Sequence, residues 1–155
     1  MVADGETSLL SVRPRNSSFE PKPLLGRGFL PETGPMISQQ QLDDLFAHTR
    51  NIYKGGKCAY NIDDTCRWSY FFVDRDLDRL RPVAEHMASL GYEVVGTLEP
   101  APGEGELPVY YLRVDRIESH TPESLFALNA ELYAIAERFG VADYDGMEVG
   151  AQDGP

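Results

Sequence analysis

Three segments of the chain carry apolar residues three and four positions apart, the spacing that places them on one face of a helix. The best marked of these begins at Thr121, whose side-chain oxygen suits an N-cap, and Pro122 fits the first helical position. Gly140 can take the left-handed conformation that ends such a helix. The apolar face between them consists of Leu125, Leu128, Leu132, Ile135 and Phe139. These signals predict one long amphipathic helix that packs against a core.

An earlier helix is predicted to begin at Ser38 and to end at Gly55-Gly56. Ser38 and Gln41 have the spacing of a capping box, and Ile37 with Leu42 has the spacing of a hydrophobic staple. Its apolar face consists of Leu42, Leu45, Phe46, Thr49, Ile52 and Tyr53.

A middle helix is predicted from the same apolar spacing, and Gly91 closes it. Pro82 falls inside this helix, so we expect it near the first turn or at a kink. The apolar positions are Leu77, Leu80, Ala84, Met87 and Leu90.

Four further segments have the composition or the alternation of strands. Residues 68–73 are aromatic and β-branched, as in a buried strand, and residues 92–98 follow the middle helix. Residues 109–118 alternate, with Tyr110, Leu112 and Val114 on one face and Arg113 and Asp115 on the other. After the last helix we expect a turn at Asp145-Gly146 and a short closing strand that ends near residue 150.

The predicted order is one helix followed by β-α-β-β-α-β. A split βαβ repeat of this kind gives a four-stranded antiparallel sheet with two helices on one face. We therefore predict the α+β class and a ferredoxin-like fold with an extra N-terminal helix. The predicted domain covers residues 37–150, between an extended Pro/Gly-rich arm at 1–36 and a short tail at 151–155. Whether the apolar residues of the arm dock on the domain or on a partner is left open: Leu24, Leu25, Phe29 and Leu30.

The formal net charge is −11 at pH 7, and all of it comes from the residues after position 36, because acidic and basic residues balance in residues 1–36. An acidic domain repels phosphate backbones, which argues against direct nucleic-acid binding. The same field would attract a basic protein partner, although a charge of this size also serves solubility alone.

Little in the sequence indicates a cofactor or a membrane. Cys58 and Cys66 flank a polar loop and are expected as reduced thiols in a chain without a secretory leader, with pairing left open. No Cys or His spacing supplies a zinc site, so neither a metal nor another cofactor is predicted. No apolar run approaches the ~20 residues of a membrane span, and a cytoplasmic protein is expected.

The predicted elements also carry the motifs of a known family. These are Ser69-Tyr-Phe-Phe-Val73, Leu90-Gly-Tyr-Glu-Val94, Leu128-Asn-Ala-Glu-Leu132, Ala136-Glu-Arg-Phe139 and Tyr144-Asp-Gly146. In this order, over roughly residues 68–150, they resemble the regulator of ribonuclease E activity B (RraB-like) family. That family includes an inhibitor that binds ribonuclease E and alters which transcripts it degrades. The resemblance implies a ferredoxin-like fold and a cytoplasmic, non-catalytic module that binds a protein.

Two groups of carboxylates and histidines have the residue types of acid–base sites. Paired carboxylates such as those of Asp143, Asp145 and Glu148 can divide acid and base roles, but a polar turn is favoured here. His120 is expected to pack at a helix entrance, because Glu118 lies too near along a strand to face the same way. The other two histidines, His48 and His86, are predicted to lie on the surface.

The two cysteines supply a third group. Lys57 precedes Cys58 and Arg67 follows Cys66, so a lowered thiol pKa and a redox-sensitive loop are left open. The sequence contains no G-x-S-x-G, phosphate-binding loop, Rossmann glycine pattern or H-E-x-x-H.

We conclude from the sequence that a non-catalytic regulator is favoured, one that binds a protein such as a nuclease with a basic segment. The predicted partner-binding residues are Asp143, Asp145 and Glu148 as acidic contacts and Tyr144 as an aromatic contact. Two alternatives stay open: an immunity protein that neutralises a toxin, and a small ferredoxin-like enzyme that uses these carboxylates. A homodimer through a sheet edge or the open sheet face is also left open.

Overall fold

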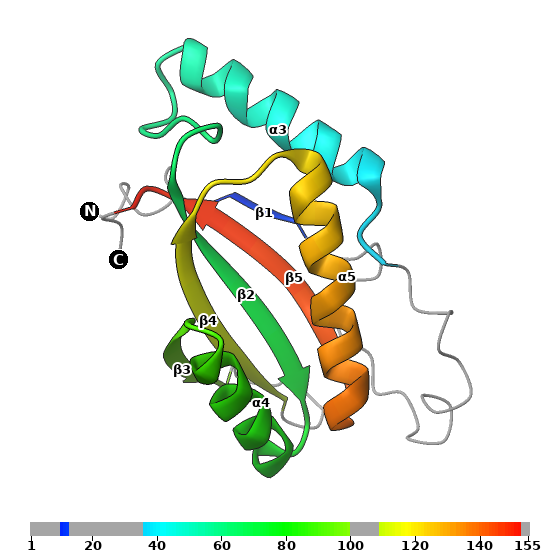
Figure 1. The fold of residues 1–155 in the computed structure, drawn as a ribbon. Helices are drawn as coiled ribbons and strands as arrows, with labels where there is room; N and C mark the ends of the chain where they lie inside the picture. The colour runs from blue at the N-terminus through cyan, green and yellow to red at the C-terminus, as the bar shows by residue number, and fades with distance from the viewer. Residues whose placement is uncertain (1–9, 13–35, 100–108, 153–155) are drawn as a thin grey trace, which may run out of the picture.

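The computed structural model describes residues 10–12, 36–99 and 109–152 (Figure 1). The predicted latch residues of the arm and the loop after Glu99 lie outside this part of the chain. The elements are β1 (Leu10–Val12), α3 (Gln39–Lys54), β2 (Cys66–Asp74), α4 (Leu77–Ser89), β3 (Glu93–Leu98), β4 (Tyr110–Glu118), α5 (Pro122–Phe139) and β5 (Asp143–Gly150). Their order confirms the predicted α+β class.

The strands form one antiparallel sheet in the order β1-β5-β2-β4-β3. Strands β5, β2, β4 and β3 have the ferredoxin-like arrangement that was predicted, with α4 and α5 side by side on one face (Figure 1). The extra helix α3 packs against α5. Strand β1 lies in the predicted arm and pairs with β5, an edge pairing that the sequence did not indicate.

The middle of the sheet is β2, which is paired with β4 on one side and β5 on the other. Trp68, Tyr70 and Phe72 alternate along it, are fully buried, and belong to the core formed with the helices. Phe71 and Val73 point to the opposite face and are also buried. A strand covered on both faces explains why the run from Tyr70 to Val73 is apolar without a break.

The helix ends are where the local signals placed them. Ser38 caps α3 in a capping box with Gln41, and Thr121 caps α5, which ends at Gly140 with φ of 74°. Along α3 the buried face is as predicted except for Tyr53, whose side chain is exposed. Pro82 lies inside α4 beyond its first turn.

The turn predicted at Asp145-Gly146 is wrong, because β5 continues through it. Tyr70 pairs with Met147 whereas Phe72 pairs with Tyr144, so the register shifts at this point. Gly146 has φ of 103°, a conformation that favours glycine. Asp145 and Gly146 form a β-bulge in the strand. A bulge, like a turn, accommodates a glycine with positive φ, which is why the sequence pattern suggested a turn.

A buried ion cluster holds the opposite face of the sheet together. The Asp115 carboxylate, with a side chain 2% exposed, accepts hydrogen bonds from Arg113 at 2.9 and 3.0 Å and from Arg67 at 2.8 Å. Burial alone would raise the pKa of Asp115, but the hydrogen bonds from Arg113, Ser69 and Arg67 lower it below its ordinary 3.8. The cluster therefore joins β2 to β4 by charge as well as by backbone pairing.

Replacing Asp115 by asparagine should lower the free energy of unfolding at neutral pH by about 3 kcal/mol, because two guanidinium groups lose their shared anion. Since the pKa is lowered in the folded state, this stabilisation is present above pH 3.8 and is lost as the pH falls through the folded pKa. Urea denaturation at neutral and acidic pH measures both effects. D78N, on the exposed surface of α4, is the control. Equal stability of the two variants would contradict the assignment.

Candidate partner-binding site

The structure places Tyr144 inside the core rather than on the surface. Its side chain is fully buried, and its hydroxyl donates to Oδ1 of Asn129 at 2.7 Å. Its ring meets the rings of Tyr133 and Phe72 at centroid distances of 5.0 and 5.5 Å. This placement does not support the predicted aromatic contact with a partner, since the ring is committed to packing between α5 and β5.

The three predicted acidic contacts share one strand, β5. Asp143 and Glu148 are half-buried, whereas Asp145 is buried at the bulge. The charges of Asp143 and Asp145 act on the neighbouring helix α5. The pKa of Tyr133 is raised mainly by burial and also by these two carboxylates. Their role in partner binding stays a prediction.

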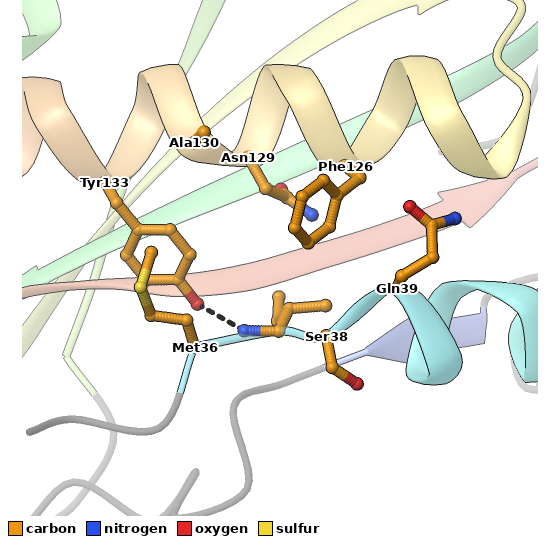
Figure 2. Close-up of a pocket in the computed structure, with 8 residues that line it drawn as sticks. Met36, Ser38, Gln39, Phe126, Asn129, Ala130 and Tyr133 are labelled. Atoms are coloured by element: carbon orange, nitrogen blue, oxygen red, sulfur yellow. Dashed lines mark hydrogen bonds between the residues drawn. The ribbon is translucent and has the colours of Figure 1, made fainter. Parts of the chain in front are cut away.

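A pocket of about 310 Å³ opens between the start of α3 and the flank of α5 (Figure 2). Two of its lining residues, Met36 and Phe126, are large apolar side chains that are 49% and 42% exposed. The Tyr133 hydroxyl accepts a hydrogen bond from the backbone N–H of Ile37 at 3.0 Å, which ties the two helices together at the pocket. The lining residues are Met36, Ile37, Ser38, Gln39, Phe126, Asn129, Ala130 and Tyr133.

This pocket was not predicted from the sequence, although the sequence contains one signal for it. Phe126, Ala130 and Tyr133 recur at spacings of four and three, beside the face of α5 that packs on the sheet. This second stripe lines a pocket only because α3 packs beside it. The position of α3 depends on tertiary packing, which the spacing of residues in α5 does not predict.

His120 lies in a hydrogen-bonded cluster, which corrects the expectation that Glu118 faces elsewhere. Nε2 of His120 is 2.9 Å from Oε2 of Glu118, and the Tyr70 hydroxyl donates to the same oxygen at 2.9 Å. Burial raises the pKa of Glu118, but the hydrogen bonds from His120 and Tyr70 lower it below its ordinary 4.5. Strand β4 ends at Glu118, so the chain turns there and brings the imidazole back onto the carboxylate.

The cluster ends at a serine, but its geometry is that of a helix cap. Nδ1 of His120 is 2.8 Å from Oγ of Ser124, which gives the residue types of a nucleophile, a base and an acid. The Ser124 hydroxyl also accepts from the N–H of Thr121 at 2.9 Å and donates to its carbonyl at 3.2 Å. These contacts fix the β4–α5 junction and engage the hydroxyl. Of the other histidines, His48 is exposed, whereas His86 is half-buried with its ring 5.3 Å from that of Phe139.

The two cysteines are free and buried. The thiol of Cys58 donates to the carbonyl of Tyr60 at 3.3 Å, and that of Cys66 donates to the carbonyl of Asn61 at 3.4 Å. Burial, and after it the nearby charge of Asp64, raise the pKa of Cys66 to about 11. A lowered thiol pKa was left open from the sequence and is wrong for Cys66, because the guanidinium of Arg67 points instead to Asp115.

The described residues contain neither a group of metal ligands nor a membrane-spanning helix. No three His, Cys, Asp or Glu side chains in this part of the chain are grouped so as to hold a metal ion. None of its helices is both long enough and apolar enough to cross a membrane.

Fold and surface together define a small ferredoxin-like α+β domain with an apolar pocket on its helical side. A family model described as "Regulator of ribonuclease activity B" (RraB) matches residues 47–149, which is more than half of the chain. The chain therefore belongs to this family, as its motifs suggested. The match begins inside α3, earlier than the resemblance at about residue 68, and it includes all of α5. A search of the curated proteins returns no match.

Replacing Glu118 by glutamine should lower the free energy of unfolding at neutral pH by about 1–3 kcal/mol, because Tyr70 and His120 lose a shared anionic acceptor. Chemical denaturation measures this loss. E85Q, an exposed position on α4, makes the same chemical change without such contacts and is the control. If both variants keep the stability of the parent, the cluster does not hold the junction.

Cys66 should be alkylated about 100-fold more slowly in the folded protein than in urea at about pH 8, because only the thiolate reacts and burial suppresses it. Iodoacetamide labelling with peptide mapping distinguishes Cys66 from Cys58. Equal labelling rates in the folded and unfolded protein would restore the reactive-thiol hypothesis.

Proposed function

We propose that this protein regulates a ribonuclease by binding to it, without catalytic chemistry of its own. The observation that carries the proposal is the match to the ribonuclease-regulator family over residues 47–149. Ribonuclease E is the first nuclease to test, because the family that the motifs resemble includes an inhibitor of that enzyme. The proposed setting is the cytoplasm, where RNA decay takes place.

The charge of the chain favours a basic segment as the part of the nuclease that is bound. The net charge of −11 would steer a positively charged partner toward the domain and repel free RNA. We propose that regulation works by occlusion: the protein covers a basic segment that the nuclease needs for its substrate. Occlusion requires a rigid surface and no catalytic residue.

Asp143, Asp145 and Glu148 remain the proposed acidic contacts on β5. Asp143 and Glu148 are half-buried, so they remain partly accessible to a partner at the surface of the sheet. Asp145 is buried at the bulge between them in sequence and contributes through its negative field, whereas Tyr144 is buried in the core. The contribution of this strand to binding is then electrostatic rather than apolar.

Binding to purified ribonuclease E, measured by calorimetry, should weaken clearly as salt rises from low to physiological ionic strength (about 0.15 M), because exposed charges are screened. The double variant D143N/E148Q should bind about tenfold more weakly at low salt, as expected for losing two partly exposed charge pairs. The double variant D78N/E85Q removes the same number of negative charges from the exposed surface of α4 and is the charge-matched control. Absence of binding would contradict the proposed function, and binding that ignores both salt and the double variant would contradict its electrostatic part.

A further inference from the structure

The pocket between α3 and α5 has the properties of a site for one apolar side chain of a protein partner, rather than of a small-molecule site. A volume of about 310 Å³ is at the lower end of the range for ligand pockets, about 300–1,000 Å³. Small-molecule sites add a few polar groups that orient the ligand. Here the polar side chains of the lining already have partners within the protein.

Each polar side chain of the lining makes a hydrogen bond to another residue of the protein. Asn129 accepts from Tyr144 at 2.7 Å and contacts the sulfur of Met147 at 3.8 Å. Tyr133 accepts from the backbone of Ile37, as described above. The remaining two are bonded within α3 and its cap: Ser38 accepts from Gln41, and Gln39 donates to Asp43. What the pocket offers an occupant is therefore apolar contact, chiefly with Met36, Phe126 and Ala130.

Among the described residues, the segments of α5 and α3 that border this apolar lining carry charges of one sign. On α5 the pocket stripe continues the same helical spacing to Glu123 before Phe126 and to Glu137 after Tyr133. Residues 122–137 contain no lysine or arginine, and neither do residues 39–46 of α3, which carry Asp43 and Asp44. Asp143 and Asp145 add to the negative field at Tyr133. An apolar segment that carries positive charge on both sides is complementary to this surface.

We propose that the α3–α5 pocket receives one large apolar side chain from a basic segment of the ribonuclease, with flanking lysine or arginine residues facing Glu123 and Glu137. This proposal rests on the proposed function and names its site. The Tyr133–Ile37 hydrogen bond holds the two pocket walls in place before binding, so little ordering cost opposes association. Interface hot spots are commonly large side chains that fill a well-packed pocket and are surrounded by contacts that exclude water.

The first test uses the full chain labelled with ¹⁵N and two short lysine-rich peptides. The peptides are identical except for one central residue, phenylalanine in one and alanine in the other. The phenylalanine peptide should shift the amide signals of Phe126 and Ala130 and bind about tenfold more tightly than the alanine peptide. Equal binding of the two peptides, or shifts confined to other elements, would overturn the proposal.

Two matched substitutions on α5 locate the effect. A130Q puts a polar side chain into the pocket, whereas A134Q makes the same change one turn later, at an exposed position outside the lining. A130Q and F126A should each weaken the phenylalanine peptide about tenfold, and A134Q should not. Circular dichroism and thermal unfolding check that the variants remain folded. Equal affinity of A130Q and A134Q would exclude the pocket.

Repeating the comparison with ribonuclease E separates the two proposals. If the parent binds the nuclease and A130Q binds equally well, the pocket proposal fails while the function stands. If the parent does not bind the nuclease but binds the phenylalanine peptide through the pocket, the function fails for this nuclease while the site stands. Weakened nuclease binding by A130Q and not by A134Q supports both.

Discussion

The burial of β2 on both faces is the constraint on which the rest of the structure depends. Its aromatic side chains toward the helices require α4 and α5 to cover that face. On the other face, the cluster of Asp115, Arg67 and Arg113 satisfies charges that the sheet would otherwise bury unpaired. Pairing with both β4 and β5 sets their register, and the bulge at Asp145-Gly146 absorbs the one mismatch. The placement of α4 and α5, the registers of β4 and β5 and the ion cluster at Asp115 all serve to cover or pair this one strand.

The same constraint produces the candidate site. Because Leu125, Leu132 and Ala136 must face the core, the adjacent flank of α5 is turned toward α3. Phe126 and Tyr133 therefore lie along a boundary between two helices instead of in open solvent. The chain belongs to a ribonuclease-regulator family, and the acidic residues around this apolar boundary support the proposal of a basic partner segment there.

The sequence predicted the fold well because its signals are local. Capping at Ser38 and Thr121 and alternation in β4 each follow from residues close together in the chain. The site was predicted poorly because it depends on distant residues. Tyr144 is of a residue type common in interfaces, but it fills the core beneath α5. The pairing of Glu118 with His120 requires the chain to turn after β4. The pocket joins residues 36–39 to residues 126–133, a relation that no spacing rule contains.

The most direct measurement of the central claim is the rate of RNA cleavage by ribonuclease E as the intact protein is added. We expect cleavage to fall in proportion to the protein added and to level off once the nuclease is fully bound. The protein alone should leave the RNA uncut. An unchanged cleavage rate at saturating protein, or cleavage by the protein in the absence of the nuclease, would contradict a non-catalytic regulator that acts by binding.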